Sequence, residues 1–245
     1  LSIRRQRQMC IRDSARKACW NFSGIFANSR HIPKVEFAGI MHPGLIGCLP
    51  SHSELAKWNK REKALFDTNP TRVPALATLP YAETAHMGRM TGDKAKAAAM
   101  EGARTVPPRE HGGNCDIKNL TRGSRVYFPV YQNGGGLSMG DIHFSQGDGE
   151  ITFCGAIEMA GYLDLRVNLI KGGVAKYDIL NPVFEISSLQ PNYSNYLVFE
   201  GISVDEKGKQ YYLDPHVAYR QACLNAINYL KKFGYTGEQI YAILG

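Results

Sequence analysis

The chain has 245 residues, of which 44% are hydrophobic, and a formal net charge of +7. This length can bury one large core or two modest ones. The sequence has no run of about 18 apolar residues, which excludes a membrane-spanning helix, and no clustered basic face, which argues against nucleic acid as a partner. Six scattered cysteines without paired spacing are typical of reduced thiols in a cytoplasmic protein.

The first half of the chain predicts two helices among irregular segments. Residues 51–54 read Ser-His-Ser-Glu, the capping-box pattern, which predicts a helix that contains Trp58 and ends before Pro70. The Ala- and Lys-rich residues 94–100 predict a short second helix. The rest of residues 67–110 carries five prolines and little periodicity, so we expect a long surface excursion.

The second half predicts strands followed by helices. Strands are expected at residues 125–132, 151–160, 163–169 and 195–204; the third alternates apolar and polar residues, as a half-buried strand does. A hairpin turn is expected at residues 205–209. Residues 217–232 predict a helix ended by Gly234, with Cys223 on its core face. Thr236 and Gln239 predict the cap of a last short helix.

These elements are segregated along the chain rather than alternating strand by helix. Such an order predicts an α+β, β-rich fold with a β-sandwich core and peripheral helices.

Residues 140–150 form the richest cluster of chemically active side chains. They hold Asp141, His143, Gln146, Asp148 and Glu150 among three glycines. Carboxylates and imidazole are ligands for a hard or borderline divalent metal. Asp141 and His143 are two residues apart, so on an extended segment they point to the same side, and Asp148 and Glu150 repeat that spacing. The alternatives are an acidic hairpin loop facing water, or a buried, hydrogen-bonded His143.

A second cluster spans residues 111–120 and contains His111, Asn114, Asp116 and Lys118. It precedes an apolar strand, and about 20 residues separate it from the first cluster. Two such clusters can converge on one pocket from neighbouring strand ends.

These clusters and three other segments resemble the formamidase branch of the acetamidase/formamidase family. The segments are HGGNCDIKNL, GDIHFSQGDGE, FCGAIEMAG, FEGISVDEKGKQ and HVAYRQACLNAINYLKKFGY. The resemblance runs from about Ala15 to Gly245. It implies hydrolysis of short linear amides, formamide above all, to a carboxylate and ammonia. It also implies a β-rich fold, zinc in some members, and a homo-oligomer.

The resemblance also implies three parts of the chain. Residues 1–14 match nothing in the family and look non-native, and their charged residues supply +3 of the net charge. Residues 15–110 are expected to be an extended and helical excursion of a truncated domain, and residues 111–245 a β-rich catalytic portion with C-terminal helices. Family members extend at both ends, so we expect residues 1–245 alone to be inactive.

Amide hydrolysis suggests a role for each residue of the two clusters. A metal with an open position needs about three protein ligands. The candidates are Asp116, Asp141 and His143, with Asp148 as an alternative. Glu150 is the expected general base. The remaining candidates are His111 as a support or substrate contact, Lys118 as an oxyanion stabiliser, and Asn114 and Gln146 as substrate-binding residues.

Two alternatives remain open. A metal-independent amidase would use Cys115 or Cys154 as nucleophile, Glu150 or Glu158 as base, and Lys118 as oxyanion stabiliser. A non-catalytic amide-binding protein can share the same fold. Glu158 is favoured as a buried ion-pair partner, and His42 as a structural residue.

Overall fold

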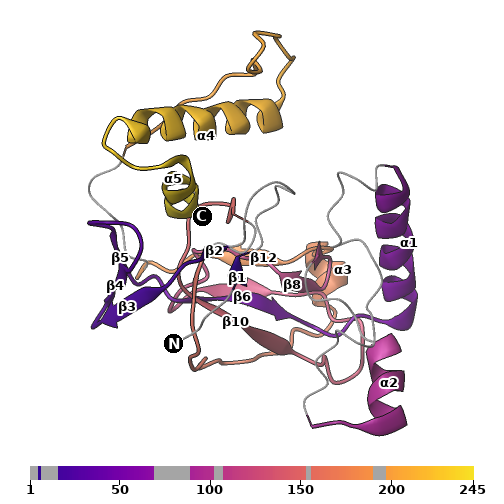
Figure 1. Ribbon diagram of the computed structural model, residues 1–245. Coiled ribbons are helices and arrows are strands. Elements are labelled where there is room, and N and C mark those ends of the chain that lie inside the picture. Colours follow the sequence, from indigo (N-terminus) through magenta and orange to yellow (C-terminus); the bar gives the residue numbers. More distant parts are fainter. Residues whose placement is uncertain (1–4, 7–15, 69–88, 102–106, 153–155, 190–196) are drawn as a thin grey trace.

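The computed structural model describes residues 5–6, 16–68, 89–101, 107–152, 156–189 and 197–245 (Figure 1). Its strands are short, and all of their described pairings are antiparallel. They are β1 (Arg5–Gln6), β2 (Arg16–Lys17), β3 (Trp20–Ser23), β4 (Phe26–Ser29), β5 (Glu36–Ala38), β6 (His42–Gly47), β7 (Pro108–Arg109), β8 (Gly112–Asn114), β9 (Arg125–Tyr127), β10 (Ser138–Ser145), β11 (Ile157–Glu158) and β12 (Val183–Glu185).

The largest sheet has five strands in the order β11-β10-β6-β8-β7, all paired antiparallel. A three-stranded sheet has the order β3-β4-β5, and β1-β2 and β9-β12 form two-stranded pairs. Five residues of β6 are buried, because this strand lies inside the sheet between β10 and β8. Strands β10, β6 and β8 are the three interior strands of this sheet.

The main apolar core lies between the three-stranded and five-stranded sheets. Ala27 of β4, Phe144 of β10 and Ile157 of β11 are buried together. The ring of Phe22 meets Phe144 edge-on, with centroids 5.0 Å apart. This packing of sheet on sheet, with helices outside, confirms the predicted α+β class with several antiparallel sheets.

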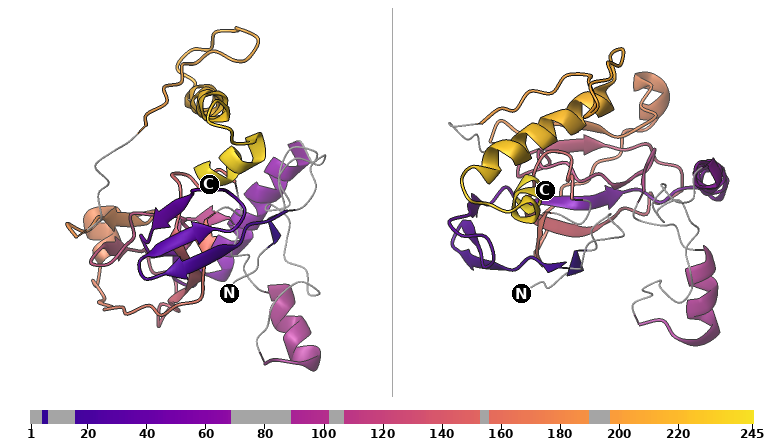
Figure 2. Two further views of the ribbon diagram at one scale, coloured as in Figure 1. Left: turned by 60° about the vertical axis from the view of Figure 1, so that its left-hand side comes forward. Right: turned by 45° about the horizontal axis from the view of Figure 1, so that its top comes forward.

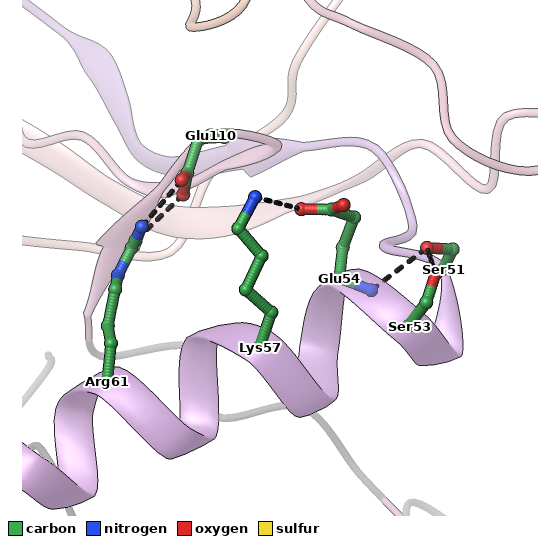
Figure 3. A network of polar contacts seen from close by, with 6 residues as sticks. All are labelled: Ser51, Ser53, Glu54, Lys57, Arg61 and Glu110. Carbon is green, nitrogen blue, oxygen red and sulfur yellow. Dashed lines mark hydrogen bonds and ion pairs between the residues drawn. The ribbon is translucent and has the colours of Figure 1, made fainter.

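Helix α1 (His52–Thr68) begins where the capping box predicts it. Ser51 Oγ accepts a hydrogen bond from the Glu54 main-chain N–H at 3.1 Å. Further along the helix, both guanidinium ends of Arg61 donate to the Glu110 carboxylate, at 2.6 and 2.8 Å (Figure 3). This bidentate ion pair holds α1 against the segment between β7 and β8.

A buried contact reinforces the attachment of α1. Trp58 is fully buried and stacks on the His111 ring, with centroids 4.9 Å apart. The buried Arg109 donates twice to the Glu62 carboxylate, both times at 2.7 Å. The edge of the main sheet is thus covered by α1, next to the shorter α2 (Gly92–Glu101) (Figure 1).

Helices α4 (Pro215–Lys231) and α5 (Gly237–Leu244) pack together, and α5 lies between α4 and the sheets (Figures 1 and 2). Ile240 of α5 is fully buried. Only Ala226 of α4 is buried, and Cys223 is half-buried, so the expectation of a core position for Cys223 is wrong. No helix in the described ranges is long and apolar enough to cross a bilayer.

All four expected helices are present, and α5 has the full capping box of Thr236 and Gln239. The turn at residues 205–209 is closed by the Val204–Gln210 bridge. The only other helix among the described residues is the short α3 (Gly173–Tyr177). Helix prediction succeeded because caps and apolar periodicity are local signals.

Strand prediction was less accurate. Residues 163–169 form no strand, and Val167 and Leu169 are 69% and 70% exposed. Alternation needs a partner strand and a surface to pack on, and neither is available here among the described residues. The strands expected at 125–132 and 151–160 shrink to β9 and β11, with 153–155 outside the described residues. Residues 197–203 form no strand, and 195–196 are not described.

Candidate functional site

The candidate site lies in the five-stranded sheet, on β10 between β11 and β6. His143 of β10 is completely buried. Its strand register places it opposite His42 of β6 on one side and Glu158 of β11 on the other. The imidazole is therefore held on a rigid strand, which suits a group that must keep a fixed direction.

Two carboxylates approach the Nε2 atom of this imidazole. The Oδ2 atom of Asp141 lies 3.5 Å from His143 Nε2, and the Oδ1 atom of Asp116 lies 3.8 Å from it. Asp116 follows β8, and the main-chain N–H groups of Cys115 and Asp116 both donate to Gly44 O, at 2.9 and 3.1 Å. The two sequence clusters thus converge, as expected.

Two further carboxylates complete the surroundings of His143. Ligand atoms of Asp116, His143 and Glu150 lie within 4.8 Å of one another, and so do those of Asp141, His143 and Glu158. The sequence pointed to Glu150 but not to Glu158 as a member of this group. The available signal for Glu158 was a carboxylate within an apolar strand, which is rare unless the carboxylate has a partner.

Three of these carboxylates stand on left-handed backbone. Asp116, Asp141 and Glu150 have φ of 44°, 51° and 43°. Such values are uncommon outside glycine and cluster at functional sites. Asp141 and His143 do lie close together, as expected, but the expected cause is wrong. The backbone is not extended at Asp141; its left-handed conformation directs the carboxylate toward His143.

Gly44 of β6 leaves open the space onto which these groups converge. A β-carbon at this position would lie 2.7 Å from Asp116 Oδ1, 2.8 Å from His143 Nε2 and 2.9 Å from the main-chain oxygen of Asp141. Real β-carbons essentially never approach other atoms so closely. Only glycine fits here without displacing the site, a requirement that the sequence did not reveal.

Behind His143, Gln146 and His42 form a buried hydrogen-bond network. Gln146 Oε1 lies 2.8 Å from His143 Nδ1 and 3.0 Å from His42 Nε2. The amide nitrogen of Gln146 donates to the main-chain oxygen of Asp116. His42 Nδ1 lies 2.7 Å from Ile40 O. His42 is 1% exposed, in agreement with the structural role expected for it.

The crowding of acids controls the protonation of the site. Burial acts most strongly on His143 and disfavours its charge. The Asp141 carboxylate 3.5 Å from Nε2, the hydrogen bond with Gln146 and the charge of Glu150 outweigh burial and raise the pKa of His143 to about 9. Burial, and secondarily the neighbouring Asp141 charge, raise the pKa of Asp116, against the opposing effects of Glu150 and His143. The site therefore favours added positive charge.

These features fit a divalent metal ion. The Nε2 atom of His143 and the Oδ1 atom of Asp116 are buried without a hydrogen-bond partner. Both border the space left open by Gly44. One imidazole nitrogen with carboxylate oxygens is a donor set that zinc and related ions accept. The described residues thus contain a possible metal-binding group at the place where the sequence suggested one.

The other candidate residues lie apart from this group. Lys118 Nζ pairs with Asp148 Oδ2 at 2.8 Å, and the Asp148 side chain is 79% exposed. His111 stacks on Trp58, at the end of β8 away from Asp116; burial, then the nearby Arg109 charge, lower the pKa of His111 to about 4. Asn114 is half-buried in β8, opposite Leu45.

The metal-independent mechanism needs Cys115 or Cys154 as its nucleophile, and the structure describes only Cys115. Burial, then the charge of Asp116, raise the pKa of the Cys115 thiol to about 11. Its Sγ donates weakly to Ile46 O at 3.9 Å. Such a thiol stays protonated near neutral pH and is a poor nucleophile. Cys154 lies outside the described residues.

The turn that carries Glu150 is anchored by the C-terminal helices. The Tyr219 hydroxyl of α4 donates to Asp148 O, and the Tyr241 hydroxyl of α5 donates to Ile151 O, both at 3.0 Å. The Gly147 N–H donates to Gly245 O at 3.0 Å. Contacts from segments about 70 to 100 residues away along the chain thus hold the turn on either side of Glu150.

Comparison with known proteins places this site in context. Residues 10–245 match the Acetamidase/Formamidase family. A formamidase from Methylophilus methylotrophus is 71% identical over 231 residues, and an acetamidase from Mycolicibacterium smegmatis is 57% identical over 233 residues; each alignment covers 94% of this chain and 57% of the relative. A solved gamma lactamase from Delftia acidovorans is 68% identical with a TM-score of 0.87, over 94% of this chain and 57% of that one. The chain spans little more than half the length of these relatives.

Proposed function

Because the chain belongs to the acetamidase/formamidase family, we propose that this protein hydrolyses the C–N bond of short linear amides, formamide above all. The products are a carboxylate and ammonia. The observation that carries the proposal is the buried convergence of Asp116, Asp141 and His143 on the space left open by Gly44. The identity of the relatives supports the reaction class.

Zinc is the proposed ion, held by Asp116, Asp141 and His143. When bound, such an ion supplies Lewis acidity and lowers the pKa of water to about 7. The ring of His143 holds its Nε2 toward the ion, and the two aspartates offset its charge. Glu158 faces the same imidazole from β11 and adds negative charge on that side.

Glu150 is the proposed general base. Ligand atoms of Glu150, Asp116 and His143 lie within 4.8 Å of one another, which puts the Glu150 carboxylate beside the proposed ion. Glu150 is thus placed to take a proton from the attacking water and to release it to the departing nitrogen. Asn114 remains the proposed contact for the small amide, since β8 leads directly into Asp116.

The alternative without a metal is less well supported. It needs an activated thiol, but Cys115 has a raised pKa, and its oxyanion stabiliser Lys118 is paired with an exposed carboxylate. We further propose a cytoplasmic location, supported by four free cysteines among the described residues. A homo-oligomer is also proposed, supported by exposed apolar side chains such as Val167, Leu169 and Val198.

One experiment tests the core of this proposal. Protein extended to the full length of its relatives is purified, analysed for zinc and assayed for ammonia release from formamide, before and after treatment with a chelator or a thiol-alkylating reagent. We expect loss of activity with the chelator, recovery with zinc, and little effect of alkylation. Activity that survives complete metal removal would contradict the proposal. A γ-lactam is assayed in parallel, because a 68% identical relative is a gamma lactamase; faster turnover of the lactam would move the substrate to cyclic amides.

A further inference from the structure

Gln146 lies at the centre of the polar network behind His143. It is 6% exposed, directly follows β10, and bonds to two histidine rings and to one main-chain oxygen. The sequence suggested that this amide binds the substrate. In the structure the Gln146 carbonyl oxygen lies 2.8 Å from His143 Nδ1 and 3.0 Å from His42 Nε2, and the amide nitrogen donates to the Asp116 main-chain oxygen. These contacts indicate that Gln146 supports other residues of the site rather than binding substrate.

The orientation of this amide is determined by its partners. Its nitrogen must face the Asp116 main-chain oxygen, because that oxygen can only accept. A flipped amide would place two oxygens against each other. The Gln146 oxygen consequently lies 2.8 Å from His143 Nδ1. Because an amide oxygen can only accept a hydrogen bond, the hydrogen in this contact must be on Nδ1. His143 is then left with Nε2 as its sole ligand atom.

The Nε2 atom is also the one that points at the carboxylates. It lies 3.5 Å from Asp141 Oδ2 and 3.8 Å from Asp116 Oδ1. The same amide restrains the main chain of Asp116, which has a left-handed φ of 44°. One side chain thus fixes the direction of the imidazole and the position of one carboxylate together.

We propose that Gln146 is a positioning residue for the metal site: it keeps the ring hydrogen of His143 on Nδ1 and turns Nε2 toward Asp116 and Asp141. This inference rests on the proposed function. Histidines that ligate metals commonly donate their second N–H to a fixed acceptor, and loss of that acceptor typically weakens metal binding by about 10–100-fold.

The test compares two substitutions with a control. Gln146→Met keeps the length of the side chain but removes both the acceptor and the donor. Gln146→Glu keeps the acceptor for His143. Gln132→Met, in the loop before β10, is the matched control. Zinc affinity is measured by competition with a chelator, and the hydrogen on the His143 ring is located by ¹⁵N-resolved NMR in zinc-loaded and metal-free protein.

We expect Gln146→Met to weaken zinc binding by about 10–100-fold and to lose the fixed Nδ1 hydrogen. Gln146→Glu should keep that hydrogen, and Gln132→Met should match the unsubstituted protein. If folded Gln146→Met binds zinc within about threefold of normal, the inference is wrong. If Gln146→Met does not fold, Gln146→Glu decides: a His143 ring protonated only on Nε2 refutes the inference.

A failure of the proposed function has a different signature. If the unsubstituted protein binds no zinc, the metal proposal fails. The NMR measurement on metal-free protein, made well above pH 9 where the His143 ring is neutral, still decides the role of Gln146: hydrogen on Nδ1 supports it, and hydrogen only on Nε2 contradicts it.

Discussion

Substitution of Gly44 by alanine tests whether the proposed metal ligands converge on the space beside this residue. The added β-carbon would lie 2.7–2.9 Å from Asp116 Oδ1, His143 Nε2 and the main-chain oxygen of Asp141. Two of the three atoms cannot yield easily. The His143 ring is held by Gln146, and the Asp141 oxygen belongs to a strand paired on both sides.

The size of the effect follows from this overlap. Overpacking a closely packed interior typically costs about 1–3 kcal/mol. In a domain of this size, that cost corresponds to a fall in melting temperature of about 2–12 °C. Because the β-carbon occupies the space between the ligand atoms, zinc affinity should also fall by at least about tenfold.

The chain provides a matched control in Gly140→Ala. Gly140 lies in β10, opposite Leu45 of β6, and a β-carbon there would meet nothing within 4 Å. This variant should keep its zinc and lie within about 1 kcal/mol of the unsubstituted protein. Calorimetry and zinc competition on both variants measure the two quantities. If Gly44→Ala matches Gly140→Ala in zinc affinity and melting temperature, the ligand atoms do not converge beside Gly44 and the reasoning is wrong.

Four further outcomes are expected. Glu150→Gln should keep its zinc and melting temperature but lower kcat by at least about 100-fold; a fall below about threefold with metal retained would place the base elsewhere. Tyr241→Phe removes one hydrogen bond to the Glu150 turn, worth about 1 kcal/mol, so kcat should fall several-fold and amide exchange in the turn should quicken, with unchanged exchange as the contrary result. The pKa of His143 is raised from 6.5 to about 9, so its stabilisation of metal-free protein is complete below pH 6.5 and is lost as pH rises through about 9; urea unfolding should show this, and His143→Asn should abolish it. Arg109→Met removes a fully buried guanidinium from a carboxylate that is only 13% exposed and should cost about 3–5 kcal/mol, against at most about 1 kcal/mol for Arg61→Met, whose side chain is half exposed.

The sequence by itself determined the features that depend on near neighbours along the chain. The capping pattern at Ser51 and Glu54 predicted the start of α1, and Thr236 with Gln239 predicted the start of α5. Both succeed because a cap is a contact between residues three positions apart. The donor chemistry of the site was equally accessible, since two short clusters contain most of the carboxylates and the imidazole that meet.

Only the tertiary structure decided which of those groups meet. Asp148 and Glu150 have the same spacing as Asp141 and His143, yet Asp148 turns outward to Lys118 while Glu150 joins the site. Glu158 arrives through the register of β11 on β10. The space beside Gly44 exists because β6 lies next to ligand atoms that come from β10 and from the residue after β8. Strand register and left-handed backbone are set by partners distant in sequence, so no local pattern reports them.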